Sequence, residues 1–303
     1  MSRHAAIPGA LIHGRYDVSG PRTPARSLHE AWPGSTLTLL DDAGHGGTGF
    51  TEAVIATLDG LADNLTPGRG ILAGVPTDQI FDVGGLTLGV RGWAGPESAQ
   101  PPLVLLPATG ETAEDWDVVA APMSATRTVF AVNLRGHGAS TWPGTYSIQL
   151  MADDVAAWLC AHFPGGVVDL VGHSLGGLVA CLIATRCPDQ VRRLVLEDVG
   201  LLKPRPPDPP AKPEGVLAFD WQVVEQVRPE IDNFAPAWAD VVAAIEVPTL
   251  VITGGATSPV PQEQIADLVH HLPDGQMVTI EAGHLVHASR PSEFTSRVLS
   301  FLS

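Results

Sequence analysis

Short apolar runs alternate with helix-like stretches over most of the chain. The runs occupy residues 102–106 (PLVLL), 128–132 (TVFAV), 167–171 (VVDLV), 193–196 (RLVL) and 249–252 (TLVI), and the helix-like stretches include residues 151–162 (MADDVAAWLCAH) and 175–187 (LGGLVACLIATRC). Continuous apolar strands separated by helices are typical of a parallel sheet covered on both faces. The pattern therefore predicts an α/β fold. Before it, FDVGGLTLGVRGW predicts a hairpin that turns at Gly84 and Gly85.

Two segments interrupt this alternation. Residues 66–76 (TPGRGILAGVP) are rich in glycine and proline, which predicts a linker. Residues 203–213 (KPRPPDPPAKP) contain six prolines, so they form neither a regular helix nor a central strand. Since a helical pattern follows at residues 220–227, this segment is either part of a small cap or a disordered surface loop. The predicted organisation is a fragment at 1–66, a linker at 67–77, a core in two parts at 78–202 and 247–303, and a cap excursion at 203–246.

An internal repeat links the two ends of the chain. The repeated stretches are LIHGRYDVSGP at residues 11–21 and VITGGATSPVP at residues 251–261. Their alignment places Asp17 opposite Thr257, and with one gap it also places His45 of DDAGH opposite His284 of EAGH. Each copy has the pattern of a strand, a helix, a second strand and then Ala-Gly-His. Two isolated copies do not form a solenoid, and they indicate two ends of the same kind of fold.

Composition narrows the partners and the compartment. Acidic residues outnumber basic ones 33 to 17, giving a formal net charge of −16, so nucleic acid and anionic membranes are poor partners. The three cysteines (Cys160, Cys181 and Cys187) lack metal-ligand spacing, which indicates reduced core thiols. No stretch has eighteen uninterrupted apolar residues, and no signal peptide is recognised. These features predict a cytoplasmic protein.

The sharpest motif is VDLVGHSLGGLVA, which places Ser174 in a G-x-S-x-G sequence between an apolar strand and an apolar helix. A serine at so tight a turn has a strained backbone, and side chains at the flanking glycine positions would collide across the turn. The turn exposes the hydroxyl near the positive end of the helix dipole, which favours an oxyanion. Ser174 is therefore the predicted nucleophile, and the alternative is a small-residue turn without chemistry.

With this motif, residues 78–303 resemble the α/β-hydrolase family. The order of elements fits, and NLRGHGAS at residues 133–140 resembles the family's loop after the fourth strand, with Asn133 in place of the usual aspartate. The resemblance implies that His284, which follows the predicted last strand, is the catalytic base. It also implies an oxyanion hole made by the amides of Leu175 and Thr109, although Pro107-Ala108 stands where the family has His-Gly. Of the other histidines, we expect His137 and His173 to be structural and His287 to line the pocket.

The catalytic acid is not at its usual position after the seventh strand. Thr257 and Ser258 stand there, and neither can ionise. A known variation of the family places the acid after the sixth strand, which here ends in Glu197-Asp198. Strand alternation directs only one of the two towards the site, and Asp198 is nearer the strand's carboxyl end. We therefore expect the triad Ser174, Asp198 and His284, with Asp220 and Asp232 as weaker candidates for the acid.

Residues 7–65 resemble the C-terminal end of proline iminopeptidases. The matching stretches are IPGALIHGRYDVSGP, LHEAWPG and DDAGHGG, and in that family Asp17 and His45 would be the acid and base. The fragment has no nucleophile elbow of its own. It could dock on the main sheet, form a homodimer with a second copy, remain loosely ordered, or bring Asp17 to His284. We expect docking or partial order rather than donation of Asp17.

Three functions remain open at this point. The first is a serine hydrolase that cleaves a small ester, thioester or amide-like acyl substrate through an acyl-enzyme, with no metal or organic cofactor. The second is a proline iminopeptidase-like aminopeptidase, in which acidic cap residues meet the substrate's ammonium group. The third is a non-catalytic binding protein on a hydrolase fold. Substrate identity and oligomeric state are not determined by the sequence.

Overall fold

The computed structural model describes residues 9–14, 22–32, 35–40, 53–54, 57, 74–97, 100–208, 210–234 and 238–303. The chain divides into two compact units, Met1–Gly70 and Ile71–Ser303. Of the residues that the structure describes, no helix is both long and apolar enough to cross a membrane.

The first unit contains a small parallel sheet. Strand β1 (Gly9–Gly14) pairs with β2 (Ser35–Leu40), and helix α1 (Arg22–Ala31) packs on both strands. The arrangement agrees with the predicted strand–helix–strand order of the first repeat. Asp17 and His45 lie outside the described residues, so their predicted roles remain predictions.

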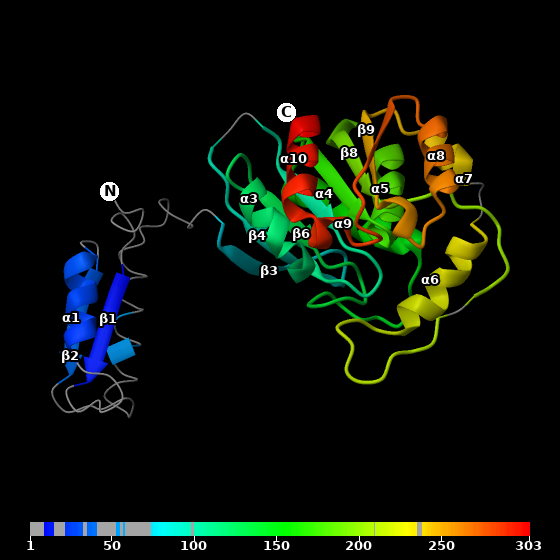
Figure 1. Ribbon diagram of the computed structural model, residues 1–303. Helices are drawn as coiled ribbons and strands as arrows, with labels where there is room; N and C mark the ends of the chain where they lie inside the picture. Colours follow the sequence, from blue (N-terminus) through cyan, green and yellow to red (C-terminus); the bar gives the residue numbers. More distant parts are fainter. Residues whose placement is uncertain are drawn as a thin grey trace. The chain divides into compact units, whose positions relative to one another are not determined.

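The second unit is built on an eight-stranded sheet with the order β10-β9-β8-β7-β5-β6-β4-β3 (Figure 1). Its strands are β3 (Pro76–Asp82), β4 (Thr87–Trp93), β5 (Leu103–Leu106), β6 (Val129–Val132), β7 (Val168–His173), β8 (Val191–Glu197), β9 (Thr249–Thr253) and β10 (Gly275–Thr279). The six strands from β5 to β10 are mutually parallel, whereas β4 runs antiparallel between β3 and β6. The predicted hairpin and the mostly parallel sheet are both confirmed.

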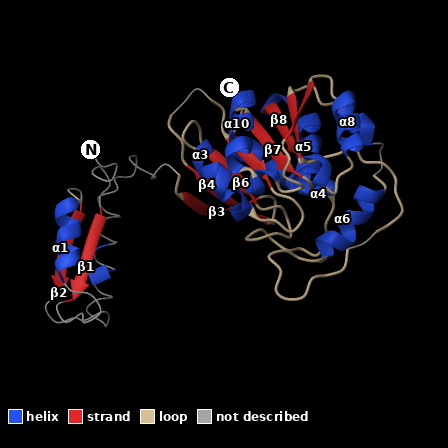
Figure 2. Cartoon of the chain, viewed as in Figure 1, coloured by secondary structure: helices blue, strands red, loops and turns tan. Residues whose placement is uncertain are grey.

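Helices cover both faces of this sheet (Figure 2). One layer contains α4 (Ile148–His162), α5 (Leu175–Arg186), α7 (Trp238–Ala243) and α8 (Gln262–His271), and the other contains α3 (Asp117–Met123), α9 (Val286–Ser289) and α10 (Pro291–Leu302). Successive strand residues face opposite layers. In β5, for example, Val104 and Leu106 join the first core while Leu103 and Leu105 join the second. Burial on both faces explains why the parallel strands are continuously apolar.

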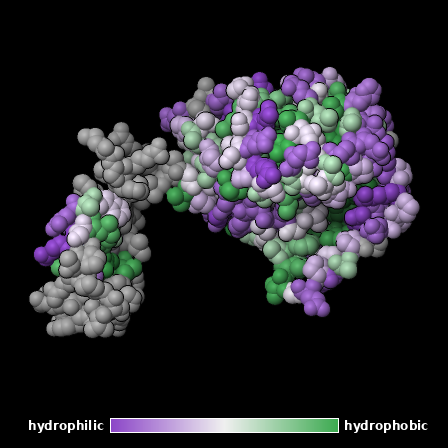
Figure 3. Space-filling model, in the orientation of Figure 1, coloured by the Kyte–Doolittle hydropathy of each residue, from purple (hydrophilic) through white to green (hydrophobic). Residues whose placement is uncertain are grey.

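The surface of the second unit is mainly hydrophilic. On the face shown in Figure 3, hydrophilic residues predominate over the second unit and apolar residues form smaller patches between them. The large apolar side chains are largely buried within the two cores, as the 45% hydrophobic composition allows.

The predicted cap lies between β8 and β9. The proline-rich residues 203–208 and 210–213 form coil, and helix α6 (Gln222–Asp232) follows. The coil is attached to this helix because the Arg205 amide donates to the Asp232 carbonyl at 3.0 Å. The predicted linker needs one correction, since its last two residues, Pro76 and Thr77, belong to β3. Proline lacks an N–H donor and is tolerated at the start of an edge strand.

Candidate active site

Ser174 occupies a sharp turn between β7 and α5. Its φ of 48° is one of two positive values at non-glycine residues that the structure describes. Neighbouring glycines make this turn sterically feasible: an added Cβ on Gly172 would lie 2.4 Å from the carbonyl oxygen of Gly176. A Cβ on Gly176 would in turn lie 2.2 Å from the carbonyl oxygen of Leu106. The G-x-S-x-G sequence thus packs the start of α5 against the loop after β5.

His284 lies beside this turn. It follows β10, and its ring centroid is 4.6 Å from that of His173, the residue before Ser174. Its side chain is 28% exposed, so one side of the imidazole is open to a substrate. His284 Nδ1 lies 2.6 Å from Oδ2 of Asp198. An acceptor at Nδ1 fixes the tautomer that leaves Nε2 able to take a proton.

Strand register brings Asp198 to this edge of the sheet. In the ladders, His173 pairs with Glu197, and Glu197 pairs with Ile252. The residues that follow these positions therefore emerge at one carboxyl edge, where α/β sheets bind ligands. Asp198 itself has a φ of 51°, so the chain turns sharply there as well.

Three donors converge on the buried Asp198 carboxylate. The Gly254 amide donates to Oδ1 at 2.9 Å, and the Ser258 hydroxyl donates to Oδ2 at 2.5 Å. His284 is the third partner. Sequence reasoning recognised only that Ser258 cannot ionise. The Ser258 hydroxyl, which follows β9, instead donates to the carboxylate of Asp198, which follows the neighbouring strand β8. A serine at the family's usual acid position was the feature of the sequence that could have indicated this contact.

His287 and His137 are buried and hydrogen-bonded. His287, expected to line the pocket, is only 1% exposed, and that expectation is wrong. Its ring stacks on Trp116 and its Nδ1 lies 2.9 Å from Glu197, the acid that points to the opposite side of the strand from Asp198. His137 accepts the Gly110 amide at Nε2, and burial lowers its pKa to about 4.

Glu111 joins the loop after β5 to the elbow, which sequence reasoning missed. Its Oε2 accepts the Ala108 amide at 2.9 Å and lies 2.8 Å from Nδ1 of His173. Burial opposes the charge on each partner, but the hydrogen bond and the attraction between them outweigh it for Glu111 and lower its pKa to about 2. Burial is likewise outweighed at His173, where the charges of Glu197 and Glu111 raise the pKa to about 9. The pair is therefore ionised at neutral pH.

The same loop leaves one amide available. The amides of Ala108, Gly110 and Glu111 donate to protein acceptors. Within the described parts of the chain, the Thr109 amide has no hydrogen-bond acceptor. Leu175 is the first residue of α5, and the first amides of a helix lack intrahelical partners. The two amides predicted for an oxyanion hole are thus both unengaged.

Three acids of the cap are engaged by groups other than His284. Asp220 accepts the Tyr146 hydroxyl at 2.7 Å, Glu230 accepts the Ile148 amide at 2.9 Å, and Asp232 forms ion pairs with two arginines. No hydrogen bond or ion pair within the described residues joins Asp220 or Asp232 to His284. The cap also touches the loop after β5, because an added Cβ on Gly110 would lie 3.1 Å from the Phe219 ring.

Among the residues that the structure describes, one buried group has a spacing that could hold a metal ion. Ligand atoms of His173, Glu197 and His287 lie within 4.8 Å of one another. The Nδ1 atoms of the two histidines, however, already contact Glu111 and Glu197. Behind the elbow, these residues therefore form a hydrogen-bonded network with Glu111.

Comparisons with known proteins agree with this architecture. Residues 101–231 match the family model of the alpha/beta hydrolase fold. A Haemophilus influenzae protein named as an esterase/lipase is 27% identical over 227 residues, which cover 63% of this chain and 79% of that protein. Esterase Rv0045c of Mycobacterium tuberculosis is 37% identical over 141 residues, but these cover only 46% of this chain and 44% of the esterase. The crystal structure of a hydrolase from Pseudomonas aeruginosa superposes with a TM-score of 0.63 at 25% identity, over 76% of this chain and 99% of the other.

Proposed function

We propose that the unit of residues 71–303, which has the α/β-hydrolase fold, is a serine hydrolase that cleaves a small carboxylic ester through an acyl-enzyme. The observation that carries the proposal is the 2.6 Å contact between His284 and Asp198 beside the strained turn at Ser174. A nucleophile, a base and an orienting acid at one sheet edge are the parts that acyl transfer requires.

In this proposal the Ser174 hydroxyl attacks the ester carbonyl while Nε2 of His284 takes its proton. The imidazolium that forms is stabilised by Asp198, whose remaining lone pairs are held by Gly254 and Ser258. His284 then returns the proton to the leaving alcohol. Water then attacks the acyl-enzyme while His284 takes its proton, and His284 passes this proton to Ser174 Oγ as the bond to the acyl group breaks and the acid product leaves.

Negative charge develops on the carbonyl oxygen during both attacks. The amides of Leu175 and Thr109 are the proposed donors, since both are unengaged and the Gly176–Leu106 contact holds their segments together. Loss of one such donor typically reduces kcat about 10²–10³-fold. Two relatives named as esterases support an ester rather than another acyl group, and thioesters and amide-like substrates remain within reach of the same chemistry.

A fluorophosphonate probe tests the nucleophile, and p-nitrophenyl esters of increasing acyl length test the activity. We expect one label on Ser174 and ester turnover that falls by more than about a thousandfold in Ser174→Ala. Ser300→Ala, an exposed serine on α10, is the matched control and should label and turn over like the unmodified chain. Labelling that survives Ser174→Ala would refute the assignment.

Absence of any label would favour a non-catalytic binding protein instead. The aminopeptidase alternative is tested by a proline arylamide under the same conditions. Three acids of the cap, Asp220, Glu230 and Asp232, are engaged by other groups of the chain and are not free to bind an ammonium group.

A further inference from the structure

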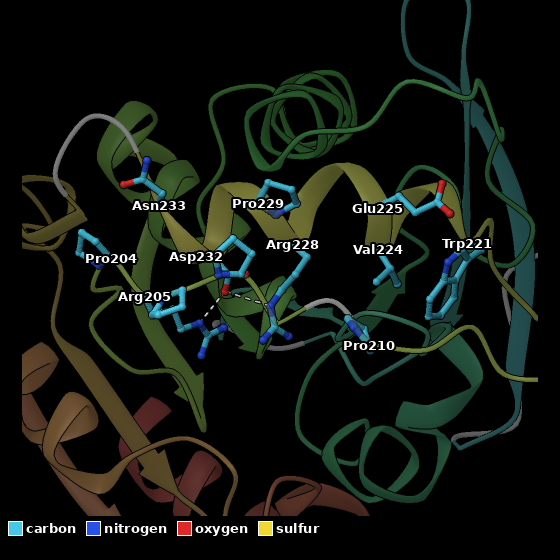
Figure 4. Close-up of a pocket in the computed structure, with 12 residues that line it drawn as sticks. Pro204, Arg205, Pro210, Trp221, Val224, Glu225, Arg228, Pro229, Asp232 and Asn233 are labelled. Carbon is cyan, nitrogen blue, oxygen red and sulfur yellow. Dashed lines mark hydrogen bonds and ion pairs between the residues drawn. The ribbon is translucent and has the colours of Figure 1, made fainter.

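A cavity of about 840 Å³ lies between the proline-rich coil and α6 (Figure 4). Its walls are mostly apolar, formed by proline rings of the coil together with Trp221, Val224 and Pro229 of the helix segment. The volume lies in the range of small-molecule sites, and such sites combine apolar walls with a few placed polar groups. Nothing in the proposed acyl transfer uses this cavity.

Two arginines and an aspartate gather at one end of the cavity. Figure 4 shows the side chains of Arg205 and Arg228 next to each other below Asp232, while Trp221 and Val224 lie towards the other end. Both guanidinium groups donate through Nε to the same oxygen of Asp232, Arg205 at 2.5 Å and Arg228 at 3.0 Å. The Asp232 side chain is only 4% exposed, and the arginine side chains are 41% and 28% exposed.

After pairing with Asp232, the two arginines still have unused N–H donors and a net positive charge. Two guanidinium groups share one carboxylate, so the cluster has a surplus of one positive charge. The terminal nitrogens of both arginines form no hydrogen bond to any residue that the structure describes. Guanidinium nitrogens favour carboxylate and other oxyanions because their fork of donors matches such groups. Glu225 also lines the cavity, but its carboxylate lies at the Trp221 end.

We propose that this cavity binds an amphipathic organic anion, namely a carboxylate joined to an apolar chain. Arg205 and Arg228 hold the carboxylate, and the proline rings and Trp221 cover the chain. The ligand binds without a chemical step. The apolar walls disfavour a small inorganic anion, which would lose hydration there without burying apolar surface.

Calorimetric titration of the full chain with octanoate tests the proposal. Octanoate should bind at one site, and Arg205→Gln and Arg228→Gln should each weaken its affinity at least about tenfold through loss of a charged hydrogen bond. Each single variant leaves Asp232 with one guanidinium partner, so both should keep the fold. Arg186→Gln is the matched control: it removes the exposed ion pair between Arg186 of α5 and Asp153 of α4 and should leave the affinity unchanged.

Two further ligands define the chemical class. 1-Octanol, which has the chain without the charge, and inorganic phosphate, which has charge without the chain, should each bind at least about tenfold more weakly than octanoate. Octanoate affinity that persists in both arginine variants, or octanol or phosphate binding as tightly as octanoate, would overturn the proposal. The titration requires no turnover, so its outcome is independent of the hydrolase activity proposed for Ser174.

Discussion

Replacing Glu111 by glutamine removes one charge from the pair that links the elbow to the loop after β5. Glutamine keeps an oxygen that can accept from the Ala108 amide and from Nδ1 of His173. The substitution therefore isolates the charge from the shape of the side chain. His173 is fully buried and Glu111 is 13% exposed, so solvent screens the pair only weakly.

The magnitude follows from the two pKa values. Lowering the pKa of Glu111 from 4.5 to about 2 corresponds to roughly 3 kcal/mol of folding free energy, at about 1.4 kcal/mol per pKa unit. The pKa of His173 rises from 6.5 to about 9 first through the charge of Glu197 and then through Glu111, so the part due to Glu111 is already contained in the value for Glu111 and is not added to it. The depressed carboxyl stabilises the fold above pH 4.5 and loses this effect as the pH falls through about 2. The raised imidazole stabilises it below pH 6.5 and loses this effect as the pH rises through about 9.

Urea denaturation followed by tryptophan fluorescence measures the effect, because every tryptophan except Trp32 lies in the second unit. We expect Glu111→Gln to reduce the free energy of unfolding by about 3 kcal/mol at pH 6 and by clearly less at pH 10. Glu114→Gln, an exposed neighbour, should stay within about 0.5 kcal/mol at both values. A loss below about 1 kcal/mol at pH 6, or equal losses at pH 6 and pH 10, would refute the reasoning.

Three other substitutions test the site and its frame. Ser258→Ala removes one hydrogen-bond donor to the buried Asp198 carboxylate and should lower kcat about fivefold with KM unchanged. The control Thr257→Ala, at an exposed residue, should change neither constant, and equal kinetics for the two variants would contradict the role of the Ser258 hydroxyl. Gly176→Ala forces a Cβ to 2.2 Å from a carbonyl oxygen and should cost roughly 1–3 kcal/mol in thermal denaturation, together with most ester turnover. Arg135→Met leaves the buried carboxylate of Asp154 unpaired and should lower the free energy of unfolding by roughly 3–5 kcal/mol. Arg186→Met breaks an exposed ion pair and should lower it by less than about 1 kcal/mol, so similar melting temperatures for the two variants would contradict this prediction.

Local patterns in the sequence were sufficient for the fold and the elbow. The strands β5 to β9 coincide with the apolar runs within two residues at each end, because parallel strands buried on both faces must be apolar throughout. The turn at Ser174 was predictable because the glycines on either side of it are imposed by contacts that any residue with a Cβ would violate. The expected linker was less well defined, and its last two residues continue into an edge strand.

The surroundings of the site were harder to predict. His284 and Asp198 are 86 positions apart, and Ser258 and Asp198 are 60 apart, so no local spacing relates them. Asp198 was expected from a family resemblance, and its hydroxyl donor was not expected. The exposure of His287 was predicted wrongly because proximity along the chain to His284 does not reveal which side of the loop faces the core.

The sequence alone determined which segments form strands and helices, and that one serine stands in a strained turn. These features depend on side-chain polarity and on steric limits within a few residues. Only the tertiary structure decided which carboxylate meets which imidazole, that Glu111 joins two loops, and that two arginines share one acid in the cap. Those pairings depend on strand register and on how the proline-rich coil packs against α6, and hydrophobic periodicity carries no information about either.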